Sequence, residues 1–311
     1  NTWQNPSKPE EEFRPELVEK LPEGFDFINI TGGEPFLRDD LNQIVEKALT
    51  RSKRLVISTN GYFTNKVTRL AEKFGDRIGI RISIEGLPVA NDELRGLKNG
   101  FDHGLRTLTT LLSMGLKDVG FGITVSDRNA KDMIDLYRLA DAMGVEFATA
   151  TVHNSYYFHK ADNMVSDQEM VAGEFEKIAG ELLKSNKPKN WFRAYFNMGL
   201  ARKVRGQKRV LPCDVGTDMF FVDPFADVLP CNGSDDPIIM GNLNRQTFEE
   251  LWHSEQAKKA RELVRNCPKQ CWMIGSVAPA MKKRMAIPLQ WVIKNKLQSI
   301  LGKGNIPLSP I

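Results

Sequence analysis

The sequence reads TGGEPFLR over residues 31–38, between a short apolar run and a helical pattern. Gly32 and Gly33 would let a ligand approach the backbone without hindrance from a Cβ atom, and Pro35 stiffens the turn. The carboxylate of Glu34 can accept hydrogen bonds from an ammonium group, so an amino-acid-like ligand would suit this loop. The alternative is an ordinary strand-to-helix turn, which is a common element of proteins.

Five short apolar runs set the architecture around this loop. They are rich in Ile, Val and Phe and too short for helices, which predicts buried strands. The runs are Phe25–Ile30, Arg54–Ser58, Ile78–Ile84, Val119–Thr124 and Glu146–Thr151. Apolar residues recur at helical spacing between them, so the sequence predicts repeated strand–helix units, a parallel sheet and an α/β fold.

Polar groups stand where these strands end. Ser58 and Asn60 close the second strand, Ser83 the third and Thr124 the fourth, while His153 follows the fifth. The carboxyl ends of parallel strands meet at one edge of a sheet, where ligands bind in α/β folds, so this convergence predicts a small-molecule pocket. For Ser58 and Asn60 a capping turn before the next helix is an equally good interpretation. The other three histidines are interpreted as structural or surface residues.

The chain changes character after about residue 186. Residues 165–187 predict one more amphipathic helix, whereas residues 186–206 are expected to form a basic, aromatic connector. Residues 209–275 combine short strands, turns and thiols, with one helix predicted over residues 247–264. We therefore expect a small second domain.

All four cysteines lie in that second domain, at Cys213, Cys231, Cys267 and Cys271. Two disulfides are the less favoured interpretation, because thiols gathered around Pro and Gly better fit a metal or cluster site in a reducing compartment. Four thiolates suit either a [4Fe–4S] cluster or a structural zinc ion. The cysteine pattern by itself leaves both open.

The composition excludes several classes of function. With 41% hydrophobic and 26% charged residues the chain is an ordinary globular protein, and no apolar run is long enough to span a membrane. Six of the 43 basic residues and none of the 39 acidic residues follow residue 280, so residues 1–280 carry a net charge of −2. An acidic body argues against nucleic acid as a partner.

Residues 279–303 predict a basic amphipathic helix, which can lie on an anionic membrane. A helix docked on the body with a solvated basic face is the preferred interpretation, because Pro288 interrupts the pattern and the apolar stripe is short. The apolar positions at helical spacing are Leu289, Val292, Ile293, Leu297 and Ile300.

Taken together, these motifs resemble a radical S-adenosylmethionine (SAM) enzyme with a C-terminal SPASM or twitch extension. The segments that carry the resemblance are GGEP at 32–35, STNG at 58–61, RISIEG at 81–86, NDELRG at 91–96 and the cysteines with their neighbours. The resemblance implies a partial (β/α)6-type barrel over residues 1–190 and an auxiliary-cluster domain over residues 205–275.

In that family the Gly-Gly-Glu motif holds the methionine amino group of SAM, and Ser and Asn at strand ends face its ribose or methionine part. An arginine after the fourth family strand often meets the SAM carboxylate. The resemblance implies that these contacts are made by Gly32, Gly33, Glu34, Pro35, Ser58, Asn60, Ser83 and Arg95. For Arg95 a surface-loop arginine is the plain alternative.

One departure concerns the reducing cluster. The family binds it through a Cys-x-x-x-Cys-x-x-Cys loop after the first strand, and no cysteine precedes Cys213 here. We expect the chain to be truncated just after that loop, to lack the first strand and to be inactive alone, with the second [4Fe–4S] cluster on the loop of the full protein. The four cysteines match the SPASM pattern, which implies one auxiliary [4Fe–4S] cluster, with zinc as the alternative.

The implied activity of the full protein is that of an enzyme. It would use SAM to generate a 5′-deoxyadenosyl radical that modifies a substrate, for which a peptide or protein is the first expectation. A flavodoxin or ferredoxin would be the reductant, and the location would be cytoplasmic, with peripheral membrane contact if the tail binds lipid. The rival hypothesis is a non-catalytic, zinc-stabilised binding protein on a degenerate barrel. The sequence names no catalytic acid or base.

Overall fold

The computed structural model describes residues 7–300 and 308–311 of the chain. Its main element is a five-stranded sheet of order β1–β2–β3–β4–β5, in which every neighbouring pair is parallel. These strands lie where the sequence predicted them, which confirms the α/β fold with a parallel sheet. They are β1 (Ile28–Ile30), β2 (Leu55–Thr59), β3 (Ile78–Ser83), β4 (Val119–Val125) and β5 (Glu146–Thr151).

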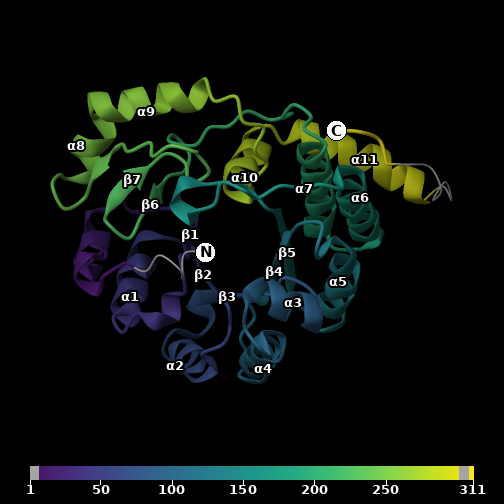
Figure 1. Ribbon diagram of the computed structural model, residues 1–311, viewed down its shortest axis with the longest axis horizontal. Coiled ribbons are helices and arrows are strands. Elements are labelled where there is room, and N and C mark those ends of the chain that lie inside the picture. Colours follow the sequence, from purple (N-terminus) through teal and green to yellow (C-terminus); the bar gives the residue numbers. More distant parts are fainter. Residues whose placement is uncertain (1–6, 301–307) are drawn as a thin grey trace.

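Helices connect consecutive strands, and the sheet curls around a centre with these helices outside (Figure 1). Neighbours in the sequence are neighbours in the sheet, which is the winding of a (β/α) barrel; in a doubly wound sheet the strand order reverses. The outer helices are α1 (Leu41–Arg51), α2 (Thr64–Phe74), α3 (Pro88–Arg95), α4 (Gly100–Ser113) and α5 (Met133–Ala142).

The two faces of the sheet differ, as strand alternation requires. In β3, Ile78, Ile80 and Ile82 are buried in the core that the helices cover, whereas Arg81 and Ser83 lie on the opposite, inner face. The register places Ile57 beside both Ile30 and Ile80, so the residues that follow β1, β2 and β3 emerge at one edge.

Two packed helices, α6 (Gln168–Lys184) and α7 (Pro188–Val204), follow β5. The predicted connector over residues 186–206 is therefore wrong, since most of it is α7. Residues 194–201 are all buried, so the alternation of apolar and polar positions that reveals a surface helix is absent. The predicted helix over residues 165–187 is confirmed in α6.

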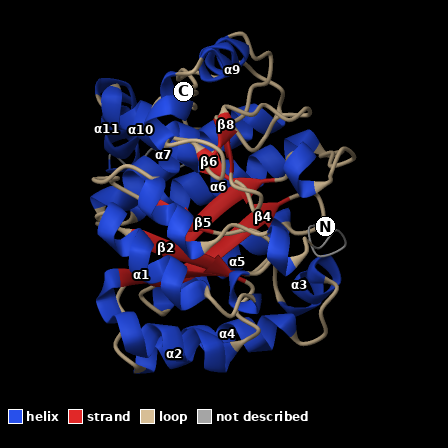
Figure 2. Cartoon of the chain, turned by 90° about the vertical axis from the view of Figure 1, so that its left-hand side faces the viewer, coloured by secondary structure: helices blue, strands red, loops and turns tan. Residues whose placement is uncertain are grey.

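The cysteines lie in a region of short elements beyond α7. Strands β6 (Phe221–Val222), β7 (Asp227–Leu229) and β8 (Gly241–Asn242) form a small antiparallel sheet. The helix predicted over residues 247–264 is divided into α8 (Phe248–His253) and α9 (Glu255–Arg265), because Ser254 is extended and its hydroxyl accepts a hydrogen bond from Ala257 N at 3.0 Å. Figure 2 shows β8 and α9 at the opposite end of the molecule from α2 and α4.

Two helices close the described chain, α10 (Ile274–Lys283) and α11 (Ala286–Ile300). The described part of residues 279–303 is divided between the end of α10 and α11, and residues 301–303 lie outside the described residues. Pro288 stands in the first turn of α11, where an N–H has no helical acceptor, so it does not interrupt that helix. The predicted boundaries 1–190, 205–275 and 279–303 stay predictions. Within the described ranges, no helix has the length and apolar character needed to cross a membrane.

Candidate functional site

Glu34 ties the loop after β1 to the end of β2. Its Oε1 accepts hydrogen bonds from Phe36 N at 3.1 Å and Thr59 Oγ1 at 2.7 Å, and its Oε2 accepts one from Asn60 N at 2.8 Å. A carboxylate offers about four acceptor positions, so one on Oε2 is left for a ligand donor. Glu34 is thereby held in place with capacity to bind an ammonium group.

The glycines of this loop leave its backbone open. Gly32 has φ of +142°, a conformation that favours glycine, and a Cβ built there would meet nothing within 4 Å. Gly33 is exposed as well, whereas Pro35 is buried and begins a 3-10 helix that Glu34 caps. The backbone at Gly32 is therefore open, and the predicted contact of these glycines with a ligand stays a prediction.

The end of β2 is shaped by side-chain hydrogen bonds. Ser58 Oγ donates to Asn29 Oδ1 across the strands at 3.2 Å, on the inner face of the sheet. Asn60 Oδ1 accepts a hydrogen bond from Tyr62 N at 2.8 Å, which forms a turn before α2. The turn interpretation of Asn60 thus has a structural basis, and its amide nitrogen and one remaining acceptor position on Oδ1 are left for a ligand.

Arg95 lies against the end of β3. Its Nη2 donates to Ser83 O at 3.0 Å and lies 3.3 Å from Glu85 Oε1. Its Nε is buried, and within residues 7–300 and 308–311 it has no hydrogen-bond partner. Burial of a donor without an acceptor costs free energy. Arg95 is therefore tied to the strand edge and differs from a free surface arginine.

Sequence reasoning missed Glu85 and Asn129. Burial raises the pKa of Glu85, although the charge of Arg95 and a hydrogen bond from Thr124 N at 2.6 Å favour its ionised form. Asn129 is 1% exposed and donates from Nδ2 to Glu85 O at 2.7 Å and Thr124 O at 2.9 Å, which joins the ends of β3 and β4. The available signal was position, because both residues closely follow buried strands.

The four cysteines form no disulfide bond, and the charges of three of them act on the thiol of the fourth, Cys231. Burial, together with the charges of the other three cysteines, raises the pKa of Cys231 to about 11, against a hydrogen bond from Gly233 N that lowers it. In the described part of the chain no three His, Cys, Asp or Glu side chains are spaced to hold a single metal ion. Four thiolates are the donor type that binds an iron–sulfur cluster, so the chemistry of this donor set fits one.

Three cations surround these thiols. Arg209 Nη1 donates to Cys271 O at 2.5 Å, and Lys269 Nζ donates to Gly233 O at 2.8 Å, two residues beyond Cys231. Burial lowers the pKa of Lys203 to about 8, against the effect of the nearby Cys271 thiolate. Cations so placed would offset the negative charge of a thiolate-bound cluster, and charge near a cluster adjusts its reduction potential.

His153 borders the thiols. A Cβ built on Gly233 would lie 3.9 Å from His153 Cδ2 and 3.7 Å from Cys231 Sγ. Burial lowers the pKa of His153 to about 4, and the charge of Lys203 acts in the same direction, so the imidazole is neutral near pH 7. His153 therefore neighbours the cysteine region, and its predicted place at the strand-end pocket stays a prediction.

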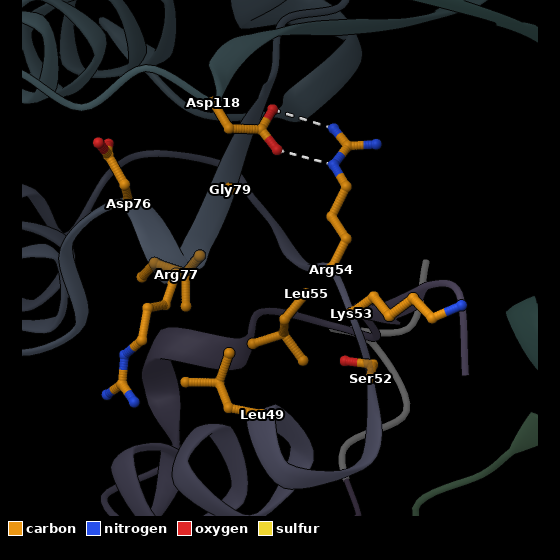
Figure 3. Close-up of a pocket in the computed structure, with 10 residues that line it drawn as sticks. Leu49, Ser52, Lys53, Arg54, Leu55, Asp76, Arg77, Gly79 and Asp118 are labelled. Carbon is orange, nitrogen blue, oxygen red and sulfur yellow. Dashed lines mark hydrogen bonds and ion pairs between the residues drawn. The ribbon is translucent and has the colours of Figure 1, made fainter. Parts of the chain in front are cut away.

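A surface hollow lies at the other, amino-terminal edge of the sheet (Figure 3). Asp118 lies between two arginines there, with hydrogen bonds from Arg54 Nε at 2.8 Å and Arg81 Nη2 at 2.5 Å. A Cβ on Gly79 would come within 2.6 Å of the Asp118 carboxylate, so only glycine leaves room for this pair. Ligand sites of barrels gather at the carboxyl ends of strands, so we assign this network to stability.

Two protein-family models match the chain. The model described as the Radical SAM superfamily matches residues 2–140, and the SPASM model, described as an iron-sulfur cluster-binding domain, matches residues 213–273. The first range contains the Glu34 loop and Arg95, and the second contains all four cysteines. Members of these families use SAM and iron–sulfur clusters, which agrees with the cofactors that the sequence predicted.

Similar curated proteins include the pre-heme d1 synthase of Dinoroseobacter shibae, 34% identical over 246 residues, with 72% of this chain and 60% of that protein covered. The mycofactocin maturase MftC of Mycolicibacterium smegmatis is 24% identical, with 76% and 60% covered. The Fe-coproporphyrin III synthase of Methanosarcina barkeri is 33% identical over 121 residues, 38% of this chain and 29% of that protein. The chain spans about 60% of the length of the first two relatives.

Solved structures with the same fold include anSMEcpe with bound AdoMet, which has a TM-score of 0.57 at 15% identity and covers 95% of this chain and 91% of its own. Streptococcus suis SuiB has a TM-score of 0.58 at 14% identity and covers 81% and 60%. Identities this low show the fold alone, and they confirm the predicted partial barrel. The chain belongs to the radical SAM superfamily and carries a SPASM iron–sulfur domain in its C-terminal third.

Proposed function

We propose that the full protein containing this chain is a radical SAM enzyme whose barrel binds SAM at the carboxyl edge of the sheet. The observation that carries the proposal is Glu34, a carboxylate fixed by three hydrogen bonds that keeps one acceptor position beside the open backbone of Gly32. When bound and reduced, SAM supplies a 5′-deoxyadenosyl radical that abstracts hydrogen from the substrate.

The residues of this edge would divide the recognition of SAM between them. Glu34 Oε2 would accept a hydrogen bond from the methionine ammonium group, and Arg95 Nε would donate one to the methionine carboxylate. Ser58 and Ser83 lie between these two groups along the edge, at the ends of β2 and β3. Their hydroxyl groups and the Asn60 amide would contact the uncharged parts of the ligand.

In the C-terminal region, Cys213, Cys231, Cys267 and Cys271 would hold one auxiliary [4Fe–4S] cluster. Ligation by four cysteines occupies every iron of the cluster, which favours electron transfer over direct binding of substrate. A flavodoxin or ferredoxin would supply electrons to the full protein. Such clusters and free thiols are typical of the cytoplasm, which we keep as the proposed location.

The test compares two glutamates in anaerobically reconstituted full protein. Glu34→Gln should weaken SAM binding at least about tenfold and abolish 5′-deoxyadenosine release, because a charge-assisted hydrogen bond is lost. Glu46→Gln, at an exposed position of α1, is the matched control and should behave like the wild type. Unchanged SAM binding by Glu34→Gln would refute the role of Glu34, and zinc without iron and sulfide in the protein would favour the non-catalytic binding protein.

For the substrate we propose a peptide. This rests on MftC, which is named as a maturase, and on the fold shared with SuiB, which has been solved with its precursor peptide SuiA. A tetrapyrrole is the second candidate, because the pre-heme d1 synthase is 34% identical to this chain. Fe-coproporphyrin III is a suitable probe, since binding shifts its Soret band: tight, stoichiometric binding would favour the tetrapyrrole, and its absence would favour the peptide.

A further inference from the structure

Helix α11 presents a stripe of apolar side chains to solvent. Leu289, Ile293 and Leu297 are 42%, 50% and 53% exposed, and their spacing of four residues places them on one helix face. Met285 and Ile287, just before them, are also exposed. These five residues are a third of the fifteen large exposed hydrophobic residues found in the described chain, and four of them lie in α11, so this exposure is concentrated and differs from scattered exposure.

The opposite face of α11 is already docked on the body. Trp291, Val292 and Asn295 are buried, and the Trp291 ring packs edge-on against Tyr195 of α7 with centroids 5.7 Å apart. Figure 1 shows α11 at the margin of the molecule, outside α6 and α7. The exposed stripe therefore lies on the face of α11 that points away from the body. The apolar stripe predicted from the sequence included Val292, which the structure instead places on the docked face.

The charges around the stripe are basic. Lys294 is exposed beside Ile293 and makes no ion pair in the described part of the chain, while Lys296 binds the backbone oxygen of Leu183. Just before α11, Lys283 pairs with Asp218 and Arg284 with Asp214, and these two pairs are neutral overall. No acidic residue follows residue 280 in the sequence.

We propose that this face of α11 binds the surface of an anionic lipid bilayer. The apolar stripe would enter the boundary between headgroups and acyl chains, and Lys294 would meet lipid phosphates, which is the arrangement of interfacial amphipathic helices. A bilayer fits better than a protein partner because the surface is one helix wide, its unpaired charge at Lys294 is positive, and no acidic residue follows residue 280 in the sequence. Neither the Glu34 loop nor the cysteines contribute to it, so the lipid contact is independent of the proposed chemistry.

The test is flotation of the full chain with phosphatidylcholine vesicles, with and without phosphatidylglycerol, at low and high salt. We expect binding only to the anionic vesicles, weakened by salt and reduced at least about tenfold by Ile293→Glu. Lys294→Glu should weaken binding less. Met164→Glu is the matched control, since Met164 is 75% exposed outside α11 and should leave binding unchanged.

Equal thermal unfolding of the variants would show that the docked face of α11 is intact. Failure of the wild type to bind anionic vesicles, or binding that Ile293→Glu leaves unchanged, would overturn the proposal. Light scattering without lipid tests whether a second copy of the chain covers the stripe instead. A wild-type dimer that Ile293→Glu dissociates would overturn the lipid proposal in favour of a dimer interface.

Discussion

The five strands of the barrel are joined by continuous main-chain ladders, whereas the cysteine region, residues 205–275, has three strands of two or three residues each. The barrel buries a large apolar core between sheet and helices. The cysteine region has a smaller cluster around Val228, Met240 and Leu251, which Leu17 from the N-terminal part of the chain completes. A parallel sheet can be stable through its core alone, while a region this sparse depends on its ligands and on its contacts with the barrel.

Removal of a proposed cluster ligand should cause the largest difference in stability between the barrel and the cysteine region. Cys231→Ser should lower the iron and sulfide content of the reconstituted full protein, because a hydroxyl is a poor ligand for iron in a cluster. Hydrogen exchange should then accelerate over residues 213–273 while β2, β3 and β4 stay protected. Ser234→Ala is the control, since the Ser234 hydroxyl is buried without a hydrogen-bond partner among the described residues. Equal loss of protection in both regions would mean that they unfold as one unit.

The second largest effect should arise where the two regions meet. Trp272 follows Cys271 and packs on α7, with its Nε1 donating to Phe196 O at 2.9 Å. A Cβ on Gly199 would lie 2.0 Å from the Trp272 ring, so Gly199→Ala should lower the free energy of unfolding by about 3 kcal/mol.

Gly180→Ala in the neighbouring helix α6 is the matched control for this variant, because a Cβ there meets nothing within 4 Å. It should raise stability by about 0.5–1 kcal/mol through the better helix propensity of alanine. Urea unfolding of both variants measures the difference. Similar stabilities for the two variants would show that the contact between α7 and Trp272 adjusts without cost.

The smallest effect concerns the barrel alone and depends on pH. Burial by itself would raise the pKa of Asp118, but hydrogen bonds from Arg54 and Arg81 outweigh it and lower that pKa to about 2. A lowered folded-state pKa stabilises the protein above the ordinary carboxyl pKa, and this stability is lost as the pH falls from about 4 towards 2.

Asp118→Asn should therefore cost about 2 kcal/mol near neutral pH, and the difference from the wild type should shrink below about pH 4. The exposed Asp39 provides the control Asp39→Asn, which should change the urea midpoint little at either pH. A constant difference between Asp118→Asn and the wild type at both pH values would refute the electrostatic explanation.

The sequence predicted the barrel well and α7 wrongly, for one physical reason. A helix that covers a sheet has a buried and an exposed face, so α1 and α5 show the apolar period that sequence analysis detects. Helix α7 is buried on nearly every side from residue 194 to residue 201 and has no such period. The same reasoning explains α11, where only the docked structure could distinguish Val292 from its exposed neighbours.

The residues of the candidate site also fall into two groups, those that the local sequence indicates and those that only the tertiary structure brings together. Local sequence determined the Glu34 loop, because glycines and a proline fix a turn through their own backbone preferences. Local sequence also determined the four thiols, since their chemistry does not depend on where the chain takes them. The tertiary structure alone decided that Glu85 and Asn129 join the strand ends, that Arg95 keeps a buried donor, and that Lys203 borders the thiols. These are contacts between residues distant in sequence, which no local pattern encodes.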